Sequence, residues 1–268
     1  MIKIIALIVI FAIALWARKA TPAGNKSGKE LRGKFSENYS PDKLRVATYN
    51  IQTGKSDDGK RNINASADVI KDVDLAGIQE VYAPSLLNLF GVGGQQSEHL
   101  SSHGGFAWIF NATRRRWLRE HRGNALLSKI NVVEWHTIML PDQSGKSFRN
   151  MTVAKVEWQG RSFHFINTHL HTKNGREEQL DVVLREFAKY PLAVLVGDFN
   201  SKAQTQALAS ALKDIEITDA ISVAGIDAND PDRIDWILTK GFNVHEGRTL
   251  EVGVSDHPFY EVSLSYKQ

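Results

Sequence analysis

The sequence predicts an α/β fold in which two packed β-sheets are flanked by helices. Three observations predict it: many strand-like runs alternate with a few helical ones, residues 192–196 form a continuous apolar run, and no Pro/Gly/Ser-rich linker interrupts the chain after about residue 42. A continuous apolar run is typical of a strand that is covered on both faces. The chain has 268 residues, of which 42% are hydrophobic, so residues 43–268 are expected to form one domain.

The first segment, residues 4–17, is almost entirely apolar, with Lys3 before it and Arg18 and Lys19 after it. A charged start and a short apolar core are typical of a secretory signal or a membrane anchor. Residues 1–20 are therefore assigned this role, and the protein is expected to be exported or membrane-anchored, in the periplasm or outside the cell. The core is short for a spanning helix, which needs roughly 20 residues, and the positive charge after it favours a cytoplasmic C-terminal side. The alternative is a buried helix of the fold.

Residues 21–42 combine Gly, Ser, Lys, Asn and Pro without periodicity, and they are predicted to be a flexible linker. Residues 44–51 then alternate as a strand does and end near Asn50. Residues 63–72 have the pattern of a helix, and residues 75–78 are a short apolar strand.

Glycine-rich sequence follows, with helical turns expected at 85–90 and 95–102. Residues 106–110 read as a strand, residues 113–122 as a basic loop, and residues 125–127 as the centre of the next strand. The later elements follow from apolar runs, from Gln159-Gly160 as a hairpin turn, and from apolar positions at helical spacing between 180 and 187. We expect strands at 132–139, 151–158, 162–168, 192–196, 233–238 and 258–264, and helices at 175–189 and 203–212.

Composition limits the chemistry. The net charge is +3 and the pI is about 9.0, which is compatible with a phosphate-bearing partner. There is no cysteine, so disulfides, thiolate catalysis and cysteine-ligated zinc are excluded.

Polar side chains end several of the strand-like runs. Hard oxygen ligands without thiols suit Mg²⁺, Mn²⁺ or Ca²⁺ better than a structural zinc, and two histidines with acids nearby can orient one another for acid–base chemistry. Taken singly each position is weak, because a Gly-Asp-x-Asn sequence also forms a simple Asx turn and a lone histidine usually has a structural role. The positions are Asn50, Glu80, His169, Asp198, Asn200, Asp235, Asp256 and His257.

In their order along the chain, these motifs resemble the endonuclease/exonuclease/phosphatase superfamily. The resemblance covers about residues 44–266. It implies a four-layered α/β sandwich of the deoxyribonuclease I type, with the site at one edge of two mixed sheets and metal-dependent cleavage of a phosphate ester. The motifs are Thr48-Tyr49-Asn50-Ile51-Gln52, Gln79-Glu80, Gly123-Asn124-Ala125-Leu126-Leu127-Ser128, Asn167-Thr168-His169-Leu170, Gly197-Asp198-Phe199-Asn200, Arg233-Ile234-Asp235-Trp236-Ile237 and Ser255-Asp256-His257.

The resemblance also implies a role for each residue. Glu80 would be the main metal-binding carboxylate with Asn50 beside it, and Asp256 would help to hold the metal or its water shell. Asp198 would orient or deprotonate the attacking water, and Asn200 would bind the phosphate or that water. The metal would be Mg²⁺, with Mn²⁺ or Ca²⁺ as alternatives.

The two histidines would bind the phosphate in this comparison. His257 would contact a non-bridging oxygen, held in the correct tautomer by Asp235, and His169 matches the histidine that deoxyribonuclease I and sphingomyelinases keep in this motif. The metal ion and the two imidazoles would compensate the charge that develops on the equatorial oxygens. Which group is the general base stays open between Asp198 and the histidines.

The most basic stretch, residues 114–122, is the candidate substrate contact. Arg114, Arg115 and Arg116 could follow a nucleic-acid backbone while Trp117 stacks on a base. They could equally touch anionic lipid head groups, or they could be a solvated loop.

Three functions remain open on sequence alone. The first is a monomeric, secreted or tethered nuclease that acts on DNA or RNA. The second is a sphingomyelinase-like lipid phosphodiesterase or a small-molecule or inositol phosphatase, although no apolar membrane-inserting hairpin is evident. The third is a phosphate-binding module without turnover, which the intact set of acids and histidines argues against.

Overall fold

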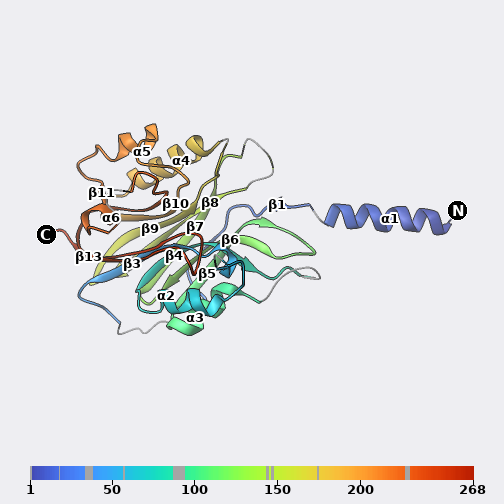
Figure 1. The fold of residues 1–268 in the computed structure, drawn as a ribbon, viewed down its shortest axis with the longest axis horizontal. Coiled ribbons are helices and arrows are strands. Elements are labelled where there is room, and N and C mark those ends of the chain that lie inside the picture. Colours follow the sequence, from blue (N-terminus) through green and yellow to red (C-terminus); the bar gives the residue numbers. More distant parts are fainter. Residues whose placement is uncertain are drawn as a thin grey trace.

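The strand-like runs pair into two seven-stranded sheets in the computed structural model of the chain (Figure 1). The structure describes residues 2–17, 19–33, 39–56, 58–86, 94–142, 145, 148–173, 175–226 and 230–268. The first sheet has the order β1 (Thr21–Pro22), β5 (Ala107–Arg115), β6 (His121–Ser128), β4 (Leu75–Ala83), β3 (Leu44–Asn50), β14 (Phe259–Tyr266) and β13 (Phe242–Leu250). The second has the order β11 (Thr218–Asp219), β12 (Asp235–Lys240), β10 (Ala193–Asp198), β9 (Arg161–His169), β8 (Asn150–Trp158), β7 (Asn131–Met139) and β2 (Ser27–Gly28).

Helices cover the outer faces of both sheets and complete four layers (Figure 1). The helices α2 (Ile63–Ile70) and α3 (Gln96–Gly104) pack on the first sheet through an apolar cluster that includes Ile70 and Leu100. On the second sheet, α4 (Arg176–Ala188) packs through Leu180 and Phe187, and α5 (Gln206–Ala211) through Leu208. A short helix, α6 (Ala220–Val223), lies against β12, β13 and β14, and a 3₁₀ turn, η1 (Gln52–Gly54), follows β3. The predicted four-layered sandwich is confirmed.

The space between the sheets is apolar over most of its length. Val46 and Leu126 of the first sheet belong to the same buried cluster as Phe165, Val194 and Val196 of the second. Toward the carboxyl ends of β3, β9 and β10 the filling becomes polar. There, Gln79 Nε2 donates to Asn167 Oδ1 at 2.8 Å, and Asn167 Nδ2 donates to the Ala125 carbonyl at 2.8 Å.

Register brings several strand ends to one edge of the sandwich. The strands β3 and β4 are parallel, as are β9 and β10, so their carboxyl ends lie together. In the second sheet Asp198 of β10 aligns with His169 of the parallel β9 and with Asp235 of the antiparallel β12. One edge of the fold therefore collects polar residues that are far apart in the sequence.

The segment predicted as a flexible linker is partly ordered against the domain, which corrects that expectation. Residues 21–22 pair with β5 and residues 27–28 pair with β7, so this segment extends the first sheet at one edge and the second sheet at another. Arg32 forms a further bridge with Trp108, and the Tyr39 hydroxyl donates to Asp74 Oδ1 at 2.5 Å. The composition of the segment hides this pairing because each strand in it is only two residues long.

Most of the other predicted elements agree with the structure, but several differ, and η1, β11 and α6 were not predicted. The strand predicted at 75–78 continues to Ala83, the helix predicted at 203–212 is shorter, and β13, which lies at a sheet edge with most of its side chains partly or fully exposed, was not predicted. The basic loop predicted at 113–122 is the end of a β-hairpin: its first and last residues belong to β5 and β6, and residues 116–120 connect the two strands. The helical turn predicted at 85–90 lies mainly outside the described residues.

The apolar segment at the start forms α1 (Ile2–Ala17), which extends away from the sandwich (Figure 1). Its large apolar side chains between residues 4 and 15 are 50–73% exposed, so the alternative of a buried helix is wrong. The helix has 16 residues. Within the described ranges no helix combines the length and the apolar character that crossing a membrane requires.

The close approach of the two sheets at Gly77 gives a first prediction. A Cβ atom added there would lie 2.4 Å from Val196 Cγ2 and 2.8 Å from Asn167 Cγ. Gly77→Ala should therefore lower the free energy of unfolding by about 1–3 kcal/mol, the usual cost of overpacking. Gly94→Ala is the matched control, because a Cβ there meets no atom within 4 Å. Equal denaturation midpoints for the two variants would contradict this account of the packing.

Candidate active site

A buried carboxylate, Asp198, lies at the centre of the polar edge. Its strand reaches this position through Gly197, where a Cβ would lie 2.1 Å from the Thr168 carbonyl oxygen, so only glycine allows β10 to pack this closely on β9. Asp198 Oδ1 accepts a hydrogen bond from the backbone N–H of Asn200 at 2.9 Å, which is the simple Asx turn considered from the sequence. The other oxygen, Oδ2, is left for different partners.

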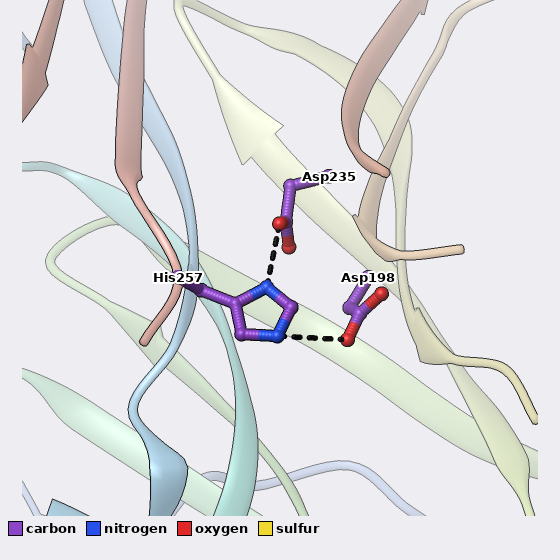
Figure 2. Close-up of side chains that lie close together, drawn as sticks. All are labelled: Asp198, Asp235 and His257. Carbon is purple, nitrogen blue, oxygen red and sulfur yellow. Dashed lines mark hydrogen bonds and ion pairs between the residues drawn. The ribbon is translucent and has the colours of Figure 1, made fainter. Parts of the chain in front are cut away.

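Those partners come from both sheets. Asn50 Nδ2 donates to Asp198 Oδ2 at 3.1 Å, and the Nε2 atoms of His169 and His257 lie 3.3 Å and 3.7 Å from it. On its other side His257 is bonded through Nδ1 to Asp235 Oδ2 at 2.7 Å, so the imidazole stands between two carboxylates (Figure 2). We call Asp198, Asp235, His169 and His257 the Asp198 cluster.

Burial and charge set the protonation of the cluster in opposite directions. Burial, and then the charge of Asp235, raise the pKa of Asp198 to about 7. Burial disfavours the charged form of His257, but the hydrogen bond and charge of Asp235 outweigh it and raise the pKa of His257 to about 9. At neutral pH His257 is therefore a cation.

His169 differs from His257. Burial, and then the charges of Arg149 and His257, hold the pKa of His169 well below its usual range. This imidazole is neutral at pH 7, which corrects the expectation that both histidines supply positive charge. When Asp198 is ionised, the 3.3 Å contact assigns the proton of His169 to Nε2, because a carboxylate can only accept.

Asn200 has an unusual backbone and anchors the adjacent loop. Its φ is +48°, a left-handed conformation that asparagine tolerates better than most residues. Its side chain Nδ2 donates to the Leu170 carbonyl at 3.1 Å, and its own carbonyl accepts from Arg176 Nη1 at 2.7 Å. The structure thus places Asn200 next to Asp198 with its side-chain nitrogen already bonded.

The three residues predicted as metal ligands lie around the cluster. Glu80 sits in a bulge of β4 with φ +56°, which interrupts the pairing with β6 between Ile78 and Val81. Asn50 has its nitrogen on Asp198 and accepts at Oδ1 from the Gln52 backbone N–H at 3.1 Å. Asp256 is exposed and accepts from Gln52 Nε2 at 2.7 Å.

A divalent cation fits the chemistry of this edge. Asp198, Asp235 and His257 offer ligand atoms that all lie within 4.8 Å of one another, the one such group within the described residues, so they could hold a metal ion. Asp235 Oδ1 is buried without a hydrogen-bond partner among the described residues. However, a protonated imidazole has no free lone pair for a metal, so with His257 in its cationic form this group is better suited to moving protons than to holding the ion.

The three predicted substrate arginines are not brought together, because side chains alternate along a strand. Arg114 lines a cavity together with Glu80 and His169. Arg115 lines a different cavity, beside Lys26 and Trp135. Arg116 lies in the loop after β5, where its backbone N–H donates to His121 Nδ1 at 3.1 Å.

Sequence reasoning missed three residues of this region. Arg149 and Arg122 line the same cavity as Arg114 and Glu80, and Gln52 connects Asn50 with Asp256. Arg122 belongs to the basic stretch 114–122, which the sequence indicated as a candidate substrate contact. Arg149 is an isolated arginine before β8, and nothing in the sequence indicated it. Its charge is felt by His169, whose pKa it helps to lower.

A family model matches most of this chain. Residues 47–257 match a family model described as the Endonuclease/Exonuclease/phosphatase family. No curated protein matches the sequence.

Solved structures resemble this chain in fold. An endonuclease/exonuclease/phosphatase from Beutenbergia cavernae is 22% identical with a TM-score of 0.69, over 84% of this chain and 72% of that one. A mannosyl-6-phosphatase from Bacteroides thetaiotaomicron is 21% identical with a TM-score of 0.62, over 83% and 100%. D. rerio TDP2, solved with a single-strand DNA product, is 14% identical with a TM-score of 0.64, over 84% and 100%.

The contact between His257 and Asp235 gives a second prediction. Asp235→Asn should lower the pKa of His257 from about 9 toward its ordinary value of 6.5, because the hydrogen bond and charge of Asp235 are the main causes that raise it. The raised pKa of His257 stabilises the folded state. This stabilisation is complete at pH values below the pKa that His257 has in the unfolded chain, and it is lost as pH rises through about 9. NMR titration of the imidazole resonances measures the shift directly.

The control is Asp256→Asn, since the charge of Asp256 raises the pKa of His257 less than the charges of Asp235 and Asp198 do. It should leave the pKa of His257 much closer to about 9. An unchanged titration in Asp235→Asn, with the fold intact by circular dichroism, would contradict the assignment.

Proposed function

Because the chain belongs to the endonuclease/exonuclease/phosphatase family, we propose that it is a nuclease that hydrolyses phosphodiesters of DNA or RNA. Members of this family are hydrolases of phosphoester bonds and depend on a divalent metal, so the chain is a metal-dependent phosphoesterase. The family does not specify the substrate, so the proposal of nucleic acid rests on the charged residues of this chain.

The observation that carries the choice is the basic wall of the cavity beside the Asp198 cluster. Arg114, Arg122 and Arg149 line this cavity together with Glu80 and His169. Trp117, in the loop that joins β5 and β6, is 46% exposed. Guanidinium groups that bind phosphates, and an exposed aromatic ring on the same hairpin that can stack on a base, are the combination that single-stranded nucleic acid needs.

Each residue of the Asp198 cluster has a different proposed role in hydrolysis. Asp198, with a pKa of about 7, is placed to accept a proton from the attacking water once it is ionised. His257, kept cationic by Asp235, donates a charged hydrogen bond to a phosphate oxygen. Neutral His169 donates its one proton, on Nε2, to Asp198 and so orients this carboxylate. Asn200 holds the loop beside Asp198 in its left-handed conformation.

A divalent ion would be held by Glu80, with Asn50 and Asp256 beside it, as the resemblance implies. When bound, the ion acts as a Lewis acid that stabilises the charge developing on the phosphate oxygens. The chain's own contribution at this place is to orient the oxygens: Gln52 bonds both Asn50 and Asp256 and so connects two of the three proposed ligands.

One observation favours a second candidate, a phosphatase for a small phosphate ester. A structural neighbour is a mannosyl-6-phosphatase. The cavity beside Glu80 is about 180 Å³, which is enough for a small anionic group but below the 300–1,000 Å³ typical of pockets for larger ligands.

The test compares substrates directly. The full chain is assayed on plasmid DNA, RNA, sphingomyelin and an inositol phosphate, each with Mg²⁺ and with EDTA. We expect cleavage of DNA or RNA with Mg²⁺, its loss in EDTA, and a rise in rate as pH increases through about 7, since Asp198 must lose its proton. Inert nucleic acid with a cleaved lipid or soluble phosphate ester would replace the nuclease proposal with the second candidate.

Asp198→Ala serves as the catalytic variant in the same assays. Its rate should fall about 10²- to 10³-fold, the usual cost of removing one preorganised group, while thermal unfolding shows that the domain remains folded. Asp181→Ala, on the exposed side of α4, is the matched control and should retain full activity. Near-normal turnover in Asp198→Ala would exclude the proposed role of this carboxylate.

We further propose that α1 associates with a membrane, which would place the enzyme at a membrane or direct its export. The support is the ring of large apolar side chains that it exposes. The full chain is expected to co-sediment with phosphatidylcholine vesicles, and Leu7→Lys to weaken this, because Leu7 is 73% exposed. Equal sedimentation of a chain that begins at residue 18 would contradict a role for α1.

A further inference from the structure

The cavity beside the Asp198 cluster holds more positive charge than a single phosphodiester requires. Three arginines from separate places in the chain line it: Arg114 from β5, Arg122 from β6, and Arg149 from the residue before β8. Glu80 and His169 line the same cavity, and His169 lies 3.3 Å from Asp198. The arginine wall is therefore continuous with the place where the scissile phosphate would lie.

These arginines crowd one another. Burial, and then the charges of Arg122, Arg116 and Arg149, lower the pKa of Arg114 to about 10. Among the described residues, the Nε atoms of Arg122 and Arg149 are buried without a hydrogen-bond partner. The ion pair recorded for Arg122, to Glu120, is at 4.0 Å. Against these three guanidinium groups the lining of the cavity has one carboxylate, Glu80, so an excess of positive charge is left that a bound anion would offset.

The side chains are also held in place. The guanidinium group of Arg122 lies over the ring of Tyr82, 4.8 Å from its centroid. Arg114 and Arg122 lie directly opposite each other in the β5–β6 ladder. The pairing places both side chains at the same position along the hairpin, and the contact with Tyr82 limits the freedom that the Arg122 side chain loses when an anion binds.

We propose that this cavity binds a second phosphate of the substrate, the one next to the phosphate that is cleaved. The proposal rests on the proposed function and names its substrate class: a strand with at least two consecutive phosphates. Arginine recognises phosphate oxygens through two parallel N–H donors. A volume of about 180 Å³ accommodates a phosphate group better than a base with its sugar, since pockets for larger ligands are about 300–1,000 Å³.

The experiment compares substrates that differ by one phosphate. The full chain with Mg²⁺ is assayed on the dinucleotide TpT, which has one phosphodiester, and on pTpT and TpTp, which add a terminal phosphate at either end. We expect kcat/KM to be about 10- to 100-fold higher for one of the two phosphorylated forms, the size of one or two charged hydrogen bonds. Equal values for all three dinucleotides would overturn the proposal.

The variants connect this preference with the cavity. Arg114→Ala should bring the ratio between the preferred dinucleotide and TpT close to one. Arg115→Ala is the matched control, because Arg115 lies on the same strand but lines the other cavity, and it should keep the ratio. A ratio that survives Arg114→Ala and Arg122→Ala would overturn the proposal.

A stability measurement shows that the variants fold. Arg114→Ala removes one of several crowded like charges, so its melting temperature should equal or exceed that of the unchanged chain. Pyrophosphate should raise the melting temperature of the unchanged chain and raise it less in Arg114→Ala. An equal rise in both would count against the cavity as the binding place.

Failure of the nuclease proposal can be told apart from failure of this one. If no dinucleotide is hydrolysed, the same ratio is measured between inositol 1,4-bisphosphate and inositol 1-phosphate. A preference for the bisphosphate that Arg114→Ala abolishes would support the second-phosphate site while the nuclease proposal fails. Absence of that preference would overturn the second-phosphate site as well.

Discussion

Contacts between the two sheets hold the active site together. The amide of Asn50, from the first sheet, donates to Asp198 of the second, and His257, which precedes a strand of the first sheet, is bonded to Asp235 of the second. Behind them the amides of Gln79 and Asn167 join the sheets in the buried interior. Leaving one such group without its partner costs about 1–3 kcal/mol, so the spacing of the sheets and the orientation of the reacting groups are set together.

The position of His257 between Asp198 and Asp235 compensates the charge of two buried carboxyl groups. Asp198 and Asp235 are both buried, and burial raises the pKa of each. One cation, His257, stands between them and is stabilised by both (Figure 2). Neutral His169 adds a hydrogen bond without adding charge. At neutral pH the carboxylate of Asp198 is therefore close to its pKa, whereas His257 is well below its pKa and stays cationic. This combination suits transfer of a proton to the carboxylate and binding of a more negative phosphate by the imidazolium.

The sequence predicts most of the fold because the strands that form the core are apolar and end in polar residues. The same pattern places Asp198 and His169 at strand ends, as the structure does, whereas Asp235 was predicted inside a strand at 233–238 and is the first residue of β12. The roles predicted for these and for the other site residues stay predictions. Other features leave little trace in a single sequence: the bulge at Glu80 breaks no apolar pattern, and Arg149 is a lone basic residue that only the packing of β8 brings to the cavity. The two-residue strands β1 and β2 are too short to show a period.

The pairing of residues 21–28 with both sheets has a consequence for the order of folding. These residues are made before their partners in β5 and β7, which lie 92 positions (Pro22 to Arg114) to 109 positions (Ser27 to His136) later in the chain. At roughly 5–20 residues per second, synthesis of those partners takes on the order of 5–20 s. Throughout that interval the segment has no partner strand to pair with. Docking of the segment then covers part of each sheet edge as a late step, after the strands it joins have been made.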